Sequence, residues 1–196
     1  LKIDFELLVK DKGEYWLILP GQKIRLIEKR YTDWIKLSFK VAPLIKVWGI
    51  AKFRLIKGGH EPELYMSALQ IDPEAPAMQI SHPGFYSVYL AKLFGSYSSL
   101  GLAEDTWALN EGVLEEEGFL DQTWGYYQER EKIFFHCLKR TRRGLLAMVF
   151  DHTDRIQHSF FRCIDPKHPL YETEQGRRYR EVIKDVYTRA DELLGR

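Results

Sequence analysis

The chain has 196 residues, of which 45% are hydrophobic and 14% aromatic, so it can bury a sizeable core as one domain or two small ones. Its formal net charge is only +1, and acidic and basic residues are interspersed throughout. This balance excludes the strongly basic composition typical of proteins that bind nucleic acids or acidic membrane surfaces. We therefore expect neither a nucleic-acid partner nor a membrane partner.

The chain has only two cysteines, Cys137 and Cys163, and they lie far apart in the sequence. Two distant cysteines do not make a disulfide framework, so we expect both to be buried thiols in a reducing compartment. No apolar run is long enough to cross a bilayer and we expect no signal peptide, which together favour a cytoplasmic location. Because the sequence opens on Leu1 in the middle of a pattern, we also expect an internal fragment of a longer protein.

Hydrophobic and polar residues alternate through much of residues 1–70, as they do in strands with one buried face. The alternation is clearest at residues 5–9, 35–41 and 51–55. Turn signals separate the segments, at residues 11–13, 20–21 and 58–59. This spacing is typical of an antiparallel sheet folded into a sandwich or half-barrel. The sequence therefore predicts a β-rich accessory subdomain over residues 1–71.

After a proline-punctuated connector at residues 72–76, the hydrophobic period changes to 3.6, which indicates helices. Ser81 is a suitable N-cap and Gly95 a suitable C-cap, so we predict a helix between them. A second helical run starts near Glu104.

Two longer helices are predicted further along the chain. The first would be capped by Asp121 and extend to about Leu138, and the last would run from about Glu172 to Leu194. The basic segment 139–143 would end the first of these helices, where solvated cations complement the negative end of the helix dipole. Phosphate binding is the alternative interpretation of this segment.

Between these two helices, Leu145–Phe150 is a continuous apolar run, typical of a strand that is buried on both faces. From Asp154 onward the hydrophobic residues recur at helical spacing, so the chain would pass from a strand into a helix at residues 151–154. Ligands of open α/β sheets bind at such carboxyl ends of strands. The predicted fold class is α+β, with an antiparallel β-rich subdomain followed by a mainly helical part, residues 72–196, that contains at least one buried core strand.

Asp154 and His158 are four residues apart, so on one helix they would project from the same face. A carboxylate and an imidazole that converge on one point are a suitable pair of ligands for a divalent metal. The alternative is structural, with Asp154 capping the helix and His158 as an ordinary surface histidine. The spacing of the two residues leaves both interpretations open.

The sequence around this pair resembles a known family. Residues 151–162, DHTDRIQHSFFR, and residues 165–171, DPKHPLY, are similar to the central metal motif of the alkaline phosphatase superfamily. The closer similarity is to its type I phosphodiesterase/nucleotide pyrophosphatase branch, also described as predicted phosphohydrolases and phosphomutases. Four earlier segments are similar to the same branch, so the resemblance spans most of the chain: residues 31–39, 71–76, 80–83 and 101–109.

The resemblance implies that Asp154 and His158 hold one of two catalytic metals, usually zinc. The enzyme would act by phosphoryl transfer on phosphate esters or nucleotide pyrophosphates. Arg155 and Gln157 would support these ligands, and His168 would line the substrate pocket. Alternatively, His168 is an ordinary loop residue held in place by Pro166 and Pro169.

The chain departs from the family in two places. The family's nucleophilic Thr or Ser, with the first metal-binding Asp, lies N-terminal to the region of resemblance, and an Asp-His pair with a further His lies C-terminal to it. This chain contains neither block, so we predict no catalytic residue in it. We expect a fragment of an α/β metallohydrolase core that packs against the rest of its parent chain and is inactive and without metal when isolated. The alternative function is a non-catalytic interaction or substrate-specificity module inserted in a larger enzyme.

Overall fold

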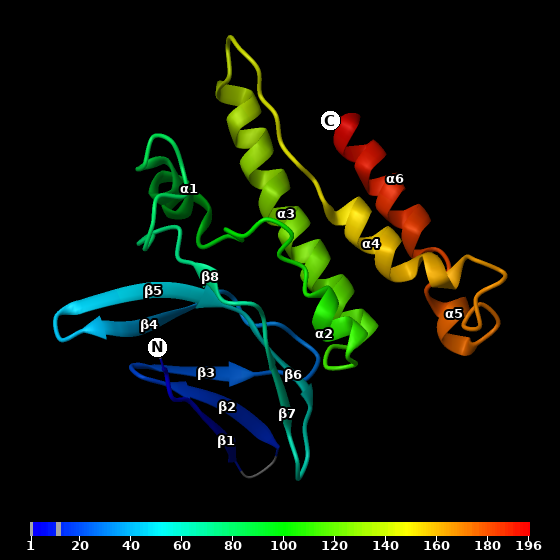
Figure 1. Cartoon of the computed structure of the whole chain (residues 1–196), viewed down its shortest axis with the longest axis horizontal. Coiled ribbons are helices and arrows are strands. Elements are labelled where there is room, and N and C mark those ends of the chain that lie inside the picture. The colour runs from blue at the N-terminus through cyan, green and yellow to red at the C-terminus, as the bar shows by residue number, and fades with distance from the viewer. Residues whose placement is uncertain (1, 11–12) are drawn as a thin grey trace. The chain divides into compact units, whose positions relative to one another are not determined.

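The computed structural model describes residues 2–10 and 13–196, and within them the fold is α+β (Figure 1). The described strands come first and end at Ile71, and every described helix follows them. This order confirms the predicted fold class, a β-rich N-terminal part followed by a mainly helical part. The chain forms two compact units, residues 1–122 and 123–196, so the first helices belong to the same unit as the strands.

The strands of the first unit form three small antiparallel sheets. The first sheet has the order β1 (Glu6–Lys10), β2 (Glu14–Leu19) and β3 (Gln22–Leu26). The second has the order β4 (Ile35–Ala42), β5 (Ile45–Ala51) and β8 (Gln70–Ile71). The third pairs β6 (Phe53–Lys57) with β7 (Glu63–Met66). Strands β1, β4 and β6 overlap the three segments in which the alternation was clearest.

Glycines allow the tight turns between these strands. The turn predicted at residues 20–21 connects β2 to β3, and Gly21 has a φ of 77°, a conformation that glycine adopts without a Cβ clash. The turn predicted at residues 58–59 lies between β6 and β7, where Gly59 has a φ of 100°. The turn predicted at residues 11–13 includes residues 11 and 12, which lie outside the described residues.

Alternation along the strands builds one hydrophobic core that the three sheets share. In β2, Leu17 and Leu19 are buried and the residue between them is only half-buried. Leu37 in β4, and Phe53 and Leu55 in β6, belong to the same cluster. Because successive side chains of a strand point to opposite faces, every second residue reaches this core.

A buried arginine joins the third sheet to the start of α3 (Glu116–Arg140). The Arg54 side chain in β6 is 1% exposed, and it donates from Nη2 to Glu115 Oε1 at 2.7 Å and from Nη1 to Asp121 Oδ2 at 2.9 Å. Nη1 also donates to the backbone carbonyl of Lys29 at 2.7 Å. The prediction that Asp121 caps the helix is therefore wrong. The helix begins earlier, where two acidic residues in its first turn complement the positive end of the helix dipole.

Helices form at both of the first two predicted places, but the first begins later than predicted. Helix α1 (Tyr86–Phe94) ends at Gly95, which has a φ of 81°, as predicted, but it begins after Ser81 rather than at it. The Ser81 hydroxyl still accepts a hydrogen bond from the backbone N–H of Ser87 at 3.0 Å, so it caps the helix from the preceding turn. Helix α2 (Thr106–Asn110) corresponds to the second predicted run.

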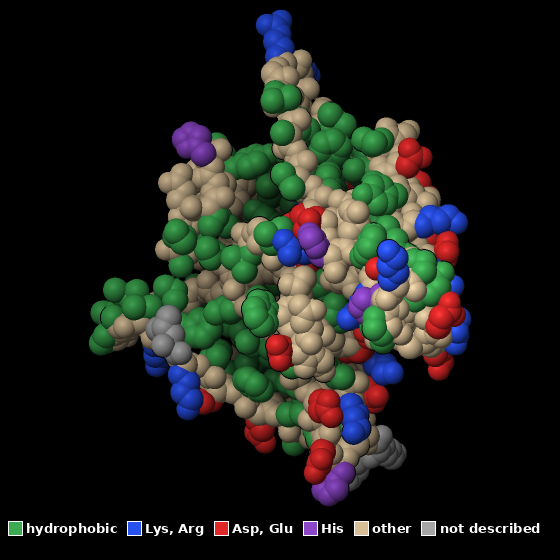
Figure 2. All heavy atoms as spheres, turned by 45° about the vertical axis from the view of Figure 1, so that its right-hand side comes forward, with side chains coloured by type: hydrophobic (Ala, Val, Ile, Leu, Met, Phe, Trp, Pro, Cys, Tyr) green, Lys and Arg blue, Asp and Glu red, His purple; other side chains and the backbone are tan. Residues whose placement is uncertain are grey.

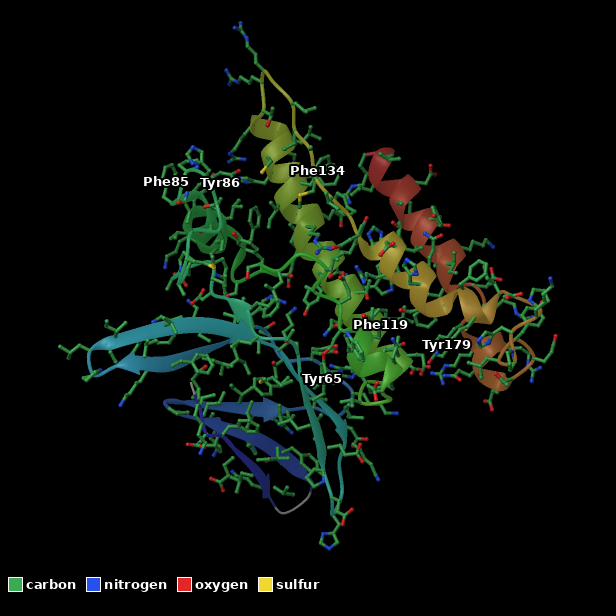
Figure 3. All side chains as sticks on the ribbon, in the orientation of Figure 1. Tyr65, Phe85, Tyr86, Phe119, Phe134 and Tyr179 are labelled. Carbon is green, nitrogen blue, oxygen red and sulfur yellow. The ribbon has the colours of Figure 1, made fainter. Side chains whose placement is uncertain are left out.

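Helix α3 continues into the second unit, whose other elements are α4 (His152–Phe160), the 3₁₀ turn η1 (Phe161–Cys163), α5 (Glu174–Arg178) and α6 (Val182–Leu194). The single helix predicted from about Glu172 to Leu194 is therefore two helices. At the break Tyr179 is buried, with its ring centroid 5.5 Å from that of Phe160 (Figure 3). No described helix has both the length and the apolar composition that a bilayer span requires.

The segment Leu145–Phe150 is not the strand that its composition predicts. It forms an extended connection between α3 and α4, drawn in yellow in Figure 1, and Leu145 is 92% exposed. A strand needs a neighbour to which its backbone can hydrogen-bond, and no described residue supplies one. The prediction of a buried core strand in the helical part is therefore wrong for residues 72–196 as described.

Candidate functional site

Asp154 and His158 project from the same face of α4. Asp154 Oδ1 lies 3.3 Å from His158 Nε2, and their side chains are 53% and 78% exposed. The helix begins at His152, so both residues have helical backbone and the spacing of four residues brings their side chains together. This confirms the predicted position of the two side chains. Their metal-binding role stays a prediction.

The separation of these two atoms fits a shared metal ion. Two ligands at about 2.0–2.1 Å from a tetrahedral zinc ion lie about 3.3 Å apart, which follows from the bond lengths and the tetrahedral angle. The observed 3.3 Å separation of Oδ1 and Nε2 therefore matches the geometry of two zinc ligands. The same separation also suits a direct carboxylate–imidazole contact within a helix, so the geometry is suited to metal binding without requiring it.

The polar residues just before Asp154 point away from this pair. The Asp151 carboxylate pairs with the Arg130 guanidinium on α3 through both terminal nitrogens, with Nη2 at 3.2 Å from Oδ2. The His152 side chain is 1% exposed and lies in the interior. Within residues 2–10 and 13–196, no group of three or more His, Cys, Asp or Glu side chains is arranged to hold a metal. The pair on α4 therefore offers two protein ligands.

His152 lies in a box of aromatic rings. Its ring centroid is 4.6 Å from that of Tyr127, 5.9 Å from Trp124 and 6.1 Å from Phe150. Neither ring nitrogen has a hydrogen-bond partner among the described residues. Burial lowers the pKa of His152 to about 4, so the imidazole is neutral at pH 7. His152 is a packing residue that fixes the start of α4 against α3.

Sequence reasoning missed this role of His152, although a signal for it was present. His152, Ile156 and Phe160 are spaced four residues apart, and all three are buried. They form the inner face of α4. Asp154 and His158 lie off that stripe, on the exposed side of the helix.

The residues predicted to support the metal ligands differ in their contacts. Arg155 Nε lies 3.6 Å from Asp154 Oδ2, so this guanidinium can help to orient the carboxylate. Gln157 Nε2 instead donates to the backbone carbonyl of Thr153 at 3.1 Å, which ties Gln157 to its own helix. Arg155 therefore lies beside Asp154, whereas Gln157 bonds to the backbone of its own helix.

His168 follows α4 and η1 in a turn. Its Nδ1 accepts a hydrogen bond from the backbone N–H of Leu170 at 3.2 Å. In the part of the chain that the structure describes, no hydrogen bond or ion pair joins His168 to Asp154 or His158. This contact is the one expected of a loop histidine, and a role in lining a substrate pocket stays a prediction.

A second candidate site, which the sequence did not reveal, is a groove in the first unit between β7 and α2. Tyr65 lies in its wall (Figure 3). The Tyr65 hydroxyl donates to Asp105 Oδ2 at 2.8 Å and accepts from Gln122 Nε2 at 3.2 Å. Burial is the main cause that raises the pKa of Tyr65. Trp107, on the rim, is 76% exposed. The groove is lined by Leu64, Tyr65, Met66, Asp105, Trp107, Ala108, Glu111 and Val113.

No protein-family model, no curated protein and no solved structure matches the chain. The case for a function therefore depends on the chain's own residues: the pair on α4 and the groove beside α2.

Proposed function

We propose that this chain is part of a metal-dependent phosphohydrolase or phosphodiesterase similar to the type I phosphodiesterase/nucleotide pyrophosphatase branch. Its substrates would be phosphate esters or nucleotide pyrophosphates. The observation that carries this proposal is the 3.3 Å separation of Asp154 Oδ1 and His158 Nε2 on an exposed helix face. A carboxylate and an imidazole at this separation suit one divalent metal ion.

Asp154 and His158 would hold this ion, for which the resemblance implies zinc. A bound zinc ion polarises a phosphoryl oxygen and stabilises the charge that develops during displacement at phosphorus. Arg155 would hold the Asp154 carboxylate in position from 3.6 Å. The buried His152 and the ion pair between Arg130 and Asp151 would fix α4, so that both ligands keep their direction.

The proposed site is incomplete in this chain. A catalytic zinc normally has three protein ligands and one open position, and α4 supplies two. The chain also lacks the nucleophile block of the resembling family, so no hydroxyl is assigned to attack phosphorus. We therefore propose that the working enzyme needs further polypeptide that packs against this chain, and that the chain alone binds zinc weakly and does not turn over substrate.

The test is zinc titration by calorimetry on the unmutated chain and on the variants Asp154→Ala and His158→Ala. An assay with a generic aryl phosphodiester accompanies it. We expect weak zinc binding that both variants reduce and no zinc-dependent hydrolysis. His168→Ala is the matched control, because it removes an imidazole outside the pair and should leave the titration unchanged. Equal zinc binding by all four proteins would refute the assignment of Asp154 and His158.

A non-catalytic interaction or specificity module is the second candidate function. The groove beside α2 favours it, because Trp107 is 76% exposed and Asp105 and Glu111 line the same groove. An exposed indole beside carboxylates suits a cationic ligand. The probe is a hexa-arginine peptide, titrated while the chain's tryptophan fluorescence is followed. A saturable change that Trp107→Ala abolishes would support this function, and no change would count against it.

The cysteines bear on where either function takes place. Cys137 and Cys163 are both free thiols. Free thiols are typical of reducing compartments, and on that basis we propose a cytoplasmic location.

A further inference from the structure

The connection between α3 and α4 contains an apolar segment whose backbone is paired with no described strand. Residues 145–150 read Leu-Leu-Ala-Met-Val-Phe and run as an extended trace (Figure 1). Their exposure alternates: residues 145, 147 and 149 are exposed, and residues 146, 148 and 150 are half-buried. Of the half-buried side chains, Phe150 packs on α3, where its ring centroid lies 5.7 Å from that of Tyr127 and 5.9 Å from that of Phe134. The segment therefore has the side-chain arrangement of a strand packed on a helix.

The backbone of this segment lacks the hydrogen bonds to a neighbouring strand that a strand normally makes, as far as the described residues show. No backbone hydrogen bond joins residues 144–150 to any described residue. Each strand of the first unit, by contrast, has at least one paired neighbour. An extended apolar segment with unpaired N–H and C=O groups is a template for pairing with another strand. Its exposed face, with Leu145 at 92% and Val149 at 77%, gives that pairing a hydrophobic driving force.

We propose that Leu145–Phe150 pairs antiparallel with the same segment of a second copy of this chain, about a two-fold axis at Ala147. In this register Leu145 lies opposite Val149 of the other copy, and Leu146 lies opposite Met148. Apolar side chains then meet apolar side chains on both faces of a two-stranded ribbon. The pairing is self-complementary, as a two-fold interface requires. This inference does not depend on the proposed function.

Charge selects the antiparallel direction. Four cations precede the segment, of which Lys139 and Arg140 lie in the last turn of α3 and Arg142 and Arg143 are exposed beyond it. Figure 2 shows Lys and Arg side chains at the tip of this connection. Asp154 follows the segment with its side chain 53% exposed, whereas the nearer Asp151 is already paired with Arg130. Antiparallel pairing places the basic end of each copy near Asp154 of the other, whereas parallel pairing would place the two basic ends together.

The first test is the oligomeric state of the full chain by sedimentation velocity over a range of concentrations. Because the interface is a single short strand, we expect a weak, concentration-dependent dimer. Leu145→Lys and Val149→Lys should each abolish the dimer, since both residues are exposed and their substitution leaves the fold of each copy intact. Leu44→Lys is the matched control, because Leu44 is equally apolar and 98% exposed in the turn between β4 and β5.

The second test fixes the register. Ala147→Cys, in a chain that also carries Cys137→Ser, should form a disulfide-linked dimer on mild oxidation, because directly opposed residues have Cβ atoms about 4.5–5.5 Å apart. Ala77→Cys in the same background is the control and should remain unlinked. A chain that stays monomeric at all concentrations, a dimer that survives both lysine variants, or a dimer lost only in Leu44→Lys would each overturn the proposal.

Discussion

The His152 imidazole lies against the Tyr127 phenol ring with 4.6 Å between the ring centroids, inside the contact of α4 with α3. Its pKa is lowered to about 4, mainly by burial; Arg130 and Arg189 also act to lower it, and Asp151 acts to raise it. An unfolded chain has no such environment, so its histidines keep a pKa near 6.5. Between pH 4 and pH 6.5, His152 is therefore protonated in the unfolded chain and largely neutral in the folded chain.

This difference predicts an acid-sensitive fold. The contribution of His152 to stability is fully present above pH 6.5 and is lost as the pH falls towards 4, by about 2 kcal/mol at pH 5. Urea unfolding measured between pH 7 and pH 5 checks this slope. His152→Phe keeps an aromatic ring in the box but cannot titrate, so its slope should be flatter by this amount. A variant with the slope of the unmutated chain would show that other groups cause the acid sensitivity.

Arg54 should be among the most sensitive charged residues of the first unit. Its side chain is 1% exposed, and removal of the guanidinium leaves Glu115 and Asp121 without it at the start of α3. Because those carboxylates are partly exposed and can recover water, we expect Arg54→Ala to lower the free energy of unfolding by about 2–3 kcal/mol rather than more. Chemical denaturation measures this loss.

Arg25→Ala is the control for that variant. Arg25 pairs with Glu14 at 3.2 Å, but its side chain is 60% exposed. Exposed pairs of this kind contribute about 0–1 kcal/mol, so this variant should unfold close to the unmutated chain. Equal losses in Arg25→Ala and Arg54→Ala would mean that the buried guanidinium has no special role.

The groove beside α2 depends on the Tyr65 hydroxyl. Tyr65→Phe removes the donor to Asp105 and the acceptor for Gln122, and we expect a loss of about 1–2 kcal/mol in the free energy of unfolding. Burial raises the pKa of Tyr65, so its phenol should stay protonated when exposed tyrosines ionise. Ultraviolet titration of the folded chain checks this. Tyr187→Phe, at a residue that is 51% exposed, should leave stability unchanged.

Local patterns predicted much of this structure, and distant contacts account for what they missed. Asp154 and His158 were correctly placed on one face because a spacing of four residues fixes their relation within one helix. Strand alternation placed Arg54 on a polar face between Phe53 and Leu55, but Arg54 is buried and bonds to Glu115, just before α3, and to Asp121 within α3, both far along the chain. The segment Leu145–Phe150 has strand composition, yet composition cannot supply the neighbour that a strand requires.

The exposure of Asp154 and His158 leads to the last prediction, which separates folding from metal binding. Their side chains are 53% and 78% exposed, and a surface pair of this spacing contributes about 0.3–0.5 kcal/mol. Without metal, Asp154→Ala and His158→Ala should therefore melt within a degree or two of the unmutated chain. A bound ion stabilises the folded state more as the ion concentration rises above the dissociation constant. Millimolar zinc should therefore raise the melting temperature of the unmutated chain by a few degrees. It should raise the melting temperatures of the two variants by less. Differential scanning calorimetry with and without zinc measures both effects. If the variants melt far below the unmutated chain without zinc, Asp154 and His158 are needed for folding. A loss of zinc binding by the variants could then not be assigned to the loss of a ligand.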